Sequence, residues 1–107
     1  MKAVVAHEYG EPDVLKFEQI PRPEPKENEA LVRVIASGVN PADPLTLSGK
    51  YAREFGTHLP LIPGYDIAGI VEKIGAKVTM LKPGDEVYGY PTFGGGWADY
   101  VTVTEGE

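Results

Sequence analysis

The sequence contains no cysteine, which excludes disulfides, thiolate metal ligands and a thiol nucleophile. Histidine is almost as scarce, and His7 and His58 are too far apart in the chain to show the short spacing of a metal site. No apolar run approaches the roughly 20 residues that span a bilayer. The N-terminal apolar run is interrupted at Glu8, too early for a secretory signal. We therefore expect a cytoplasmic protein without a membrane segment.

Positive charge is also in short supply. Ten lysines and arginines stand against 16 acidic residues, which gives a formal net charge of −6. The basic residues are scattered singly, whereas phosphate binding needs them clustered, so nucleic acid is not an expected partner. The length of 107 residues suits one domain, and 42% apolar and 24% charged residues are ordinary for a globular chain.

Short β-strands dominate what the sequence does contain. Apolar runs and apolar–polar alternation, separated by Gly, Pro and Asp turns, are typical of strands in a sandwich or barrel. The predicted strands span 2–7, 15–20, 30–39, 67–74, 86–90 and 97–103. Three prolines at every second position between 21 and 28 favour an extended surface connector over the alternative, an SH3-type ligand.

The best helix candidate spans 40–49. Either Asn40 caps it with Pro41 at the first position, or Asp43 caps it with Pro44 there, and Gly49 is expected to end it. Residues 50–61 are expected to form an irregular loop.

Three glycines, Gly64, Gly69 and Gly75, punctuate an apolar run that predicts one long, curved strand. Their spacing resembles the zinc alcohol dehydrogenase signature, G-H-E-x-x-G followed by five residues, G, two residues and V. Tyr65 stands at the histidine of that signature and Asp66 at its glutamate.

Further motifs extend this resemblance over nearly the whole chain. They are Met1–Val5, Gly10–Leu15, Ser37–Asp43, Gly49–Tyr51, Pro63–Asp66, Lys82–Val87 and Gly95–Val101. In this order they resemble the N-terminal GroES-like domain of the medium-chain dehydrogenase/reductase superfamily, nearest to its zinc-free quinone oxidoreductase (zeta-crystallin-like) branch. The resemblance implies a mainly β, GroES-like, partly open β-barrel with one or two short helices over residues 1–107.

Zinc does not fit these residues. In the zinc branch the first ligand is a cysteine directly after G-V, where this chain has Asn40, and the histidine ligand is Tyr65. Only the carboxylate of Asp66 remains, whereas catalytic zinc takes about three protein ligands. We predict no metal site.

The resemblance places Asn40 and Tyr51 near the nicotinamide and the substrate, as catalytic and cofactor-contacting residues. It makes Tyr65 and Asp66 candidates for the substrate pocket. The alternatives are a helix cap for Asn40, packing for Tyr51 and a hydrogen bond to neighbouring backbone for Asp66. Asp43 is expected to cap a helix.

The glycine-rich segment near the end of the chain is not a phosphate cradle by its pattern. Gly94–Gly96 leads into a predicted strand and not a helix, so we expect a turn. Phe93 and Trp97 on either side are expected to have packing roles, with contact to a substrate as the alternative.

The implied activity is hydride transfer from NADPH to a small-molecule quinone or conjugated enone, which needs hydrogen-bond donors and no metal. The superfamily's Rossmann domain and C-terminal return segment are absent from the sequence, so we expect an inactive fragment with unpaired sheet edges and a possible homodimer. The alternatives are an enoyl-thioester reductase domain and a non-enzymatic GroES-like binding or structural module such as a co-chaperonin. The polar, proline-stiffened segment 21–28 argues against the co-chaperonin.

Overall fold

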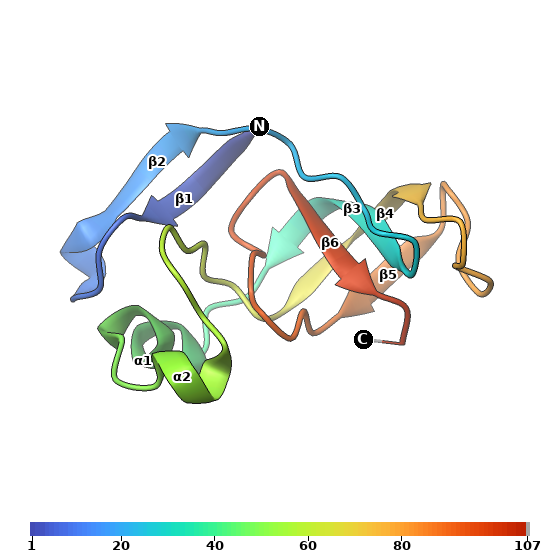
Figure 1. Cartoon of the computed structure of the whole chain (residues 1–107). Helices are drawn as coiled ribbons and strands as arrows, with labels where there is room; N and C mark the ends of the chain where they lie inside the picture. The colour runs from blue at the N-terminus through green and yellow to red at the C-terminus, as the bar shows by residue number, and fades with distance from the viewer. Residues whose placement is uncertain (107) are drawn as a thin grey trace.

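Strands form most of the regular structure in residues 1–106, which a computed structural model describes (Figure 1). The strands are β1 (Lys2–Ala6), β2 (Leu15–Gln19), β3 (Glu29–Ser37), β4 (Ile67–Ile74), β5 (Glu86–Gly89) and β6 (Tyr100–Thr104). Two short helices, α1 (Ala42–Ser48) and α2 (Ala52–Phe55), lie between β3 and β4, and a single 3₁₀ turn spans Pro12–Val14.

The central strand of the larger sheet is β3. It pairs antiparallel with β4 on one side and β6 on the other, and the sheet order is β5-β4-β3-β6. Two register shifts interrupt the β3–β4 pairing, between Leu31 and Val32 and between Val34 and Ala36. Such bulges bend a sheet and increase its twist. Within residues 1–106, β5 and β6 are the unpaired edges of this sheet, so the barrel is partly open, which confirms the expected fold class.

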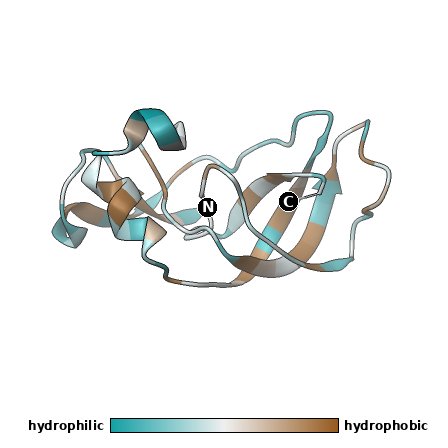
Figure 2. Cartoon of the chain, turned by 90° about the horizontal axis from the view of Figure 1, so that it is seen from below, coloured by the Kyte–Doolittle hydropathy of each residue, from teal (hydrophilic) through white to brown (hydrophobic). Residues whose placement is uncertain are grey.

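The main core fills the curve of this sheet. Val32, Val71 and Val101 are almost completely buried, and they meet in register because Val32 pairs with Val71 on one side and Val101 on the other. Ala30, Ile67 and Val103 complete the cluster. In Figure 2 the strands carry long apolar stretches interrupted by polar ones, the alternation on which the sequence prediction rested.

A smaller unit is built from the β1–β2 hairpin and the helices. Its core is Ala6, Leu47 and Leu61. Single bridges from Ala3 to Ala98 and from Ala6 to Leu61 connect β1 to the rest of the chain. The helices therefore lie below the hairpin and beside the larger sheet, as Figure 1 shows.

The helix predictions were partly wrong. Helix α1 begins after Pro41, whose backbone is already right-handed helical, and neither Asn40 nor Asp43 caps it with a side chain. The Asp43 side chain instead accepts hydrogen bonds from outside the helix, as described below. Gly49 ends α1 in the left-handed conformation, as predicted. The expected irregular loop contains α2, a single helical turn with too few residues for a periodic signal in the sequence.

The glycine-punctuated strand has the predicted bounds, since β4 spans Ile67–Ile74, but of the three glycines only Gly69 lies inside it. A Cβ at Gly69 would lie 2.2 Å from the carbonyl oxygen of Arg33 on β3, so the two strands approach closely here. Gly64 precedes the strand with a φ of +104°, and Gly75 follows it where the chain turns against Lys26.

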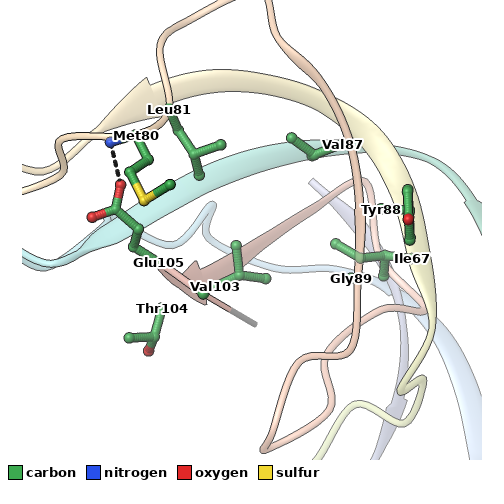
Figure 3. A pocket seen from close by; sticks show the side chains of 10 residues that line it. Ile67, Met80, Leu81, Val87, Tyr88, Gly89, Val103, Thr104 and Glu105 are labelled. Carbon is green, nitrogen blue, oxygen red and sulfur yellow. Dashed lines mark hydrogen bonds between the residues drawn. The ribbon is translucent and has the colours of Figure 1, made fainter.

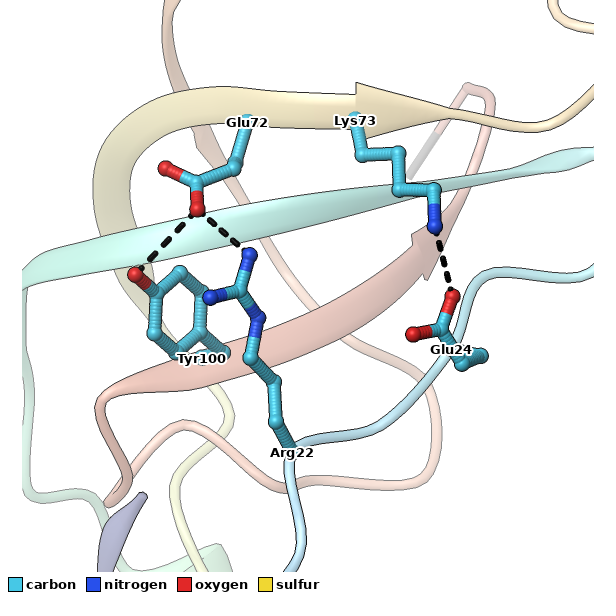
Figure 4. A network of polar contacts seen from close by, with 5 residues as sticks. All are labelled: Arg22, Glu24, Glu72, Lys73 and Tyr100. Atoms are coloured by element: carbon cyan, nitrogen blue, oxygen red, sulfur yellow. Dashed lines mark hydrogen bonds and ion pairs between the residues drawn. The ribbon is translucent and has the colours of Figure 1, made fainter.

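The proline-rich segment connects β2 to β3 and is fixed to the sheet by charged side chains (Figure 4). Arg22 pairs with Glu72 and lies 4.1 Å from the ring centroid of Tyr100, while Lys73 donates to Glu24 at 2.8 Å. The hydrogen bond from Lys73 lowers the pKa of Glu24 below its usual value. These contacts hold the segment against the protein, which argues against its presentation as a free ligand.

Candidate functional site

The structure brings Asn40 and Asp66 together, although they are 26 residues apart in the sequence. Asn40 follows β3 and Asp66 directly precedes β4. The Nδ2 group of Asn40 donates a hydrogen bond to Oδ2 of Asp66. Asn40 stands where the zinc branch has its cysteine ligand, and Asp66 stands at the glutamate of the zinc signature. In this structure the two are hydrogen-bond partners.

A buried carboxylate holds both chain segments of this pair. Asp43 is only 2% exposed, and its Oδ2 accepts from the backbone N–H of Asn40 at 2.8 Å. Its Oδ1 accepts from the backbone N–H of Gly64, also at 2.8 Å. One side chain of α1 therefore fixes the positions of the segments that carry Asn40 and Asp66. This bridging role replaces the helix cap that the sequence predicted for Asp43.

The backbone around Asp66 is fixed a second time from β3. The carbonyl oxygen of Asp66 accepts from the Ser37 hydroxyl at 2.8 Å and from the backbone N–H of Gly38 at 3.1 Å. Trp97 in turn donates from Nε1 to the carbonyl oxygen of Gly38 at 3.0 Å. Trp97 is half-buried, and this hydrogen bond connects its ring to the chain beside Asp66.

Tyr65 is buried at 5% exposure and makes one hydrogen bond and one ring contact. Its hydroxyl lies 2.7 Å from the hydroxyl of Thr46. Thr46 donates its only hydroxyl hydrogen to the carbonyl oxygen of Ala42, so Tyr65 is the donor to Thr46. The Tyr65 ring stacks on Tyr90 with centroids 5.7 Å apart. Burial raises the pKa of the Tyr65 hydroxyl, because it disfavours the charged phenolate.

The Tyr65 ring forms part of the wall of a cavity of about 330 Å³ between the helices and the segment that follows β5. The cavity is lined by Ala42, Arg53, Glu54, Gly56, Tyr65, Tyr90, Thr92 and Phe93. The lining residues include three aromatic residues, one arginine and one glutamate. This mixture of apolar surface and a few polar groups is typical of a site for a small organic molecule.

Phe93 corrects one expectation. We expected a packing role, but its side chain is 72% exposed and lies at this cavity. The sequence also gave no indication of Arg53, Thr46 or Tyr90 at the site. Arg53 belongs to α2, where we expected irregular structure, and the contacts of Thr46 and Tyr90 with Tyr65 join segments far apart in the sequence.

Asn40, Asp66 and Tyr51 lie outside the lining of this cavity, so Tyr65 is the one member of the four predicted site residues in its wall. Asp66 instead lines a shallow groove with Gly38, Ala68 and Tyr88, because neighbouring residues of an extended segment point to opposite sides. Tyr51 directly precedes α2 and is 41% exposed.

A second cavity, of about 240 Å³, lies between the unpaired edges of the sheet and is mainly apolar (Figure 3). Ile67, Leu81, Val87 and Val103 line it, and Glu105 accepts from the backbone N–H of Met80 at 2.6 Å at its rim. None of the four site residues predicted from the sequence is in its lining, so we do not assign the chemistry to it.

The backbone N–H groups of the glycine-rich segment are used within the protein. Gly95 donates to the carbonyl oxygen of Ile62 at 2.9 Å, and Gly96 donates to that of Gly64 at 3.0 Å. The segment has no regular structure and follows a turn at Thr92 and Phe93, and its donors already have protein partners. Among residues 1–106, no group of three or more His, Cys, Asp or Glu side chains is arranged to hold a metal ion. No helix in the same range is long and apolar enough to cross a membrane.

Comparison with known proteins agrees with this architecture. Residues 26–107 match the alcohol dehydrogenase GroES-like domain, and the chain belongs to that family.

The relatives within this class are oxidoreductases. The chain is 40% identical over 106 residues to the quinone oxidoreductase of Lama guanicoe and 43% identical over 114 residues to a chloroplastic NADPH-dependent alkenal/one oxidoreductase of Arabidopsis thaliana. These alignments cover 98% of the chain but only 32% and 29% of the relatives. The chain thus spans about a third of the length of the relatives it matches.

Solved structures give the same result. The quinone oxidoreductase of Coxiella burnetii superposes with a TM-score of 0.88 at 34% identity, over 98% of this chain and 35% of that one. An Escherichia coli quinone oxidoreductase solved in complex with NADPH superposes with a TM-score of 0.82 at 29% identity, over 97% of this chain and 31% of that one.

The buried hydroxyl of Tyr65 gives a pH-dependent prediction. The pKa of Tyr65 is higher in the folded chain than in the unfolded chain, so the hydroxyl contributes its full stabilisation below about pH 10, the ordinary tyrosine pKa. This stabilisation is lost as the pH rises further. Tyr65→Phe should cost about 1 kcal/mol of unfolding free energy near neutral pH, through its lost hydrogen bond. The difference in unfolding free energy between the wild type and Tyr65→Phe should shrink as the pH approaches about 11. Only the wild type has a hydroxyl at residue 65 that ionises in the unfolded chain, and this ionisation favours unfolding.

Urea unfolding of both proteins across this pH range measures the effect. Tyr88→Phe controls for loss of a surface hydroxyl, since Tyr88 is 89% exposed. A deficit for Tyr65→Phe that stays constant across the range would contradict the assignment.

Proposed function

We propose that this chain is the substrate-side domain of a zinc-independent, NADPH-dependent oxidoreductase that transfers hydride to a quinone or a conjugated enone. The observation that carries the proposal is the aromatic cavity at Tyr65, one residue along the chain from the Asn40–Asp66 pair. The names of the relatives, quinone oxidoreductase and alkenal/one oxidoreductase, support the same class of substrate.

The cavity suits a flat, conjugated ring. Tyr65, Tyr90 and Phe93 offer aromatic surface on which such a ring can stack. The volume of about 330 Å³ is at the small end of ligand sites, which run from about 300 to 1,000 Å³, and matches a one- or two-ring compound. Arg53 adds a cationic donor that attracts the negative charge developing on a quinone or enone oxygen.

Asn40 and Tyr51 are the proposed contacts to the nicotinamide and the substrate. An amide offers both a donor and an acceptor, which matches the carboxamide of a nicotinamide ring, and a tyrosine hydroxyl can donate to an oxygen that gains charge. When bound, NADPH supplies the hydride. The chain's own residues would hold and orient the reacting groups, and a proton would reach the reduced oxygen from the Tyr51 hydroxyl.

The chain fits only part of the cofactor. Pyrophosphate binding commonly uses free N–H groups of a glycine-rich turn at a helix N-terminus. The N–H groups of Gly95 and Gly96 already donate to Ile62 and Gly64. The proposal therefore assigns the pyrophosphate to a further domain, outside these 107 residues.

Two finer points belong to the same proposal. The absence of cysteine supports a cytoplasmic location. The edges of β5 and β6, unpaired within residues 1–106, support self-association of the 107-residue chain, with a homodimer as the simplest form.

The proposal predicts that turnover depends on the further domain. The isolated 107-residue chain should show no NADPH oxidation in the presence of a simple benzoquinone or an unsaturated ketone, monitored by absorbance. The longer protein that carries this chain should reduce at least one of them. Steady turnover by the isolated chain would contradict the assignment of the cofactor to a further domain.

Tyr51→Phe tests the role of the hydroxyl in the longer protein. Loss of a positioned proton donor should lower kcat by about 100-fold, while the Kd for NADPH changes by less than about threefold. Tyr100→Phe is the matched control, because its hydroxyl contacts Glu72 in the outer polar network of Figure 4. Unchanged kcat in Tyr51→Phe would remove Tyr51 from the mechanism.

A further inference from the structure

We propose that Asp66 is a positioning residue that fixes the rotation of the Asn40 side-chain amide. The inference rests on the proposed function, in which Asn40 contacts the reacting groups. Asp66 does so through its carboxylate and does not itself line the aromatic cavity.

The chemistry of the pair permits one arrangement. A side-chain amide can rotate by half a turn and exchange its donor and acceptor ends, which have nearly the same shape. An ionised carboxylate only accepts hydrogen bonds, so Oδ2 of Asp66 attracts Nδ2 of Asn40 and repels Oδ1. The carboxylate therefore selects one rotamer and turns the rest of the amide away from Asp66.

The surroundings of Asp66 make this selection rigid. Its carbonyl oxygen is held by the Ser37 hydroxyl and the Gly38 N–H, so the backbone from which the carboxylate projects is fixed. The backbone of Asn40 is fixed separately by Asp43. Hydrogen bonds thus hold the main chain in place at both residues of the Asn40–Asp66 pair.

Gly38 leaves the room that this geometry needs. A Cβ at Gly38 would lie 3.3 Å from Oδ2 of Asp66 and 3.8 Å from Nδ2 of Asn40. The first distance is tight, so a side chain at this position would displace the carboxylate by a few tenths of an ångström, whereas the second is an ordinary contact.

The consequence for catalysis is that the donor and the acceptor of the Asn40 amide point in fixed directions. An amide with fixed rotation presents its donor and acceptor in constant places, which reduces the ordering that a ligand must otherwise impose. Without Asp66, Asn40 would present either end. Outer residues that orient contacting groups typically change affinity or activity by about 10- to 100-fold when removed.

The first test uses the 107-residue chain and needs no enzyme activity. In the NMR spectrum of the wild type, one side-chain N–H of Asn40 should be shifted and protected from exchange by the carboxylate. In Asp66→Ala, both N–H signals should move to the range of free amides and exchange rapidly. Asp99→Ala is the matched control, since Asp99 accepts a hydrogen bond from the N–H of Lys2 and lies away from the pair. Unchanged Asn40 signals in Asp66→Ala would overturn the inference.

The second test uses the longer protein and separates the inference from the proposed function. Asp66→Ala should lower kcat/KM for the quinone about tenfold, and Asp66→Glu, which keeps the accepting carboxylate, should recover part of the loss. Asp99→Ala should have wild-type kinetics. If Asn40→Ala lowers activity and Asp66→Ala does not, the positioning role is wrong while the proposed function stands.

If Asn40→Ala leaves activity unchanged, the proposed role of Asn40 is wrong, and the positioning role fails with it. If Asp66→Ala fails to fold, Asp66→Asn replaces it in both tests. Its amide accepts or donates equally well, so the Asn40 amide should lose its fixed rotation and kcat/KM should fall. Wild-type kcat/KM in that variant would contradict the inference.

Discussion

The candidate site depends on one buried carboxylate. Asp43 lies in the first turn of α1, at 2% exposure, and accepts from the backbone N–H groups of Asn40 and Gly64. Burial of a carboxylate is costly unless hydrogen bonds compensate it. Here one strong acceptor satisfies two main-chain donors that would otherwise lack a partner. The same two bonds join the loop after β3 to the segment before β4, and these segments carry Asn40, Tyr65 and Asp66.

From this anchor the neighbouring residues take different directions. Tyr65 forms part of the wall of the aromatic cavity and donates to Thr46, whereas Asp66 lines the shallow groove and accepts from Asn40. Asn40 and Tyr65 stand where the zinc branch of the superfamily has a cysteine and a histidine ligand. The structure shows what these positions do when they carry no ligand chemistry: one joins an amide–carboxylate pair, and the other becomes an aromatic wall.

The strands could be predicted because their signal is local. Apolar–polar alternation places β1 to β6 to within a few residues, and Gly49 ends α1 because only glycine adopts the left-handed conformation without strain. Four site residues were proposed from a resemblance, and of these Tyr65 lines the aromatic cavity, whereas Asn40, Tyr51 and Asp66 lie outside its lining. Asn40 and Asp66 are 26 residues apart, and Asp43 and Gly64 are 21 apart. A local sequence pattern does not predict hydrogen bonds between residues so far apart. Local rules made Asp43 a helix cap, and tertiary hydrogen bonds overrode them.

The most direct test of this account is the hydrogen exchange of the Asn40 and Gly64 amides in Asp43→Ala. We predict that both amides lose protection, that the amide of Val71 in β4 keeps it, and that the unfolding free energy falls by about 3 kcal/mol. Asp43→Asn should lie between Asp43→Ala and the wild type, because its side chain keeps one accepting oxygen. Unchanged protection of Asn40 and Gly64 in Asp43→Ala would contradict the central role of this carboxylate.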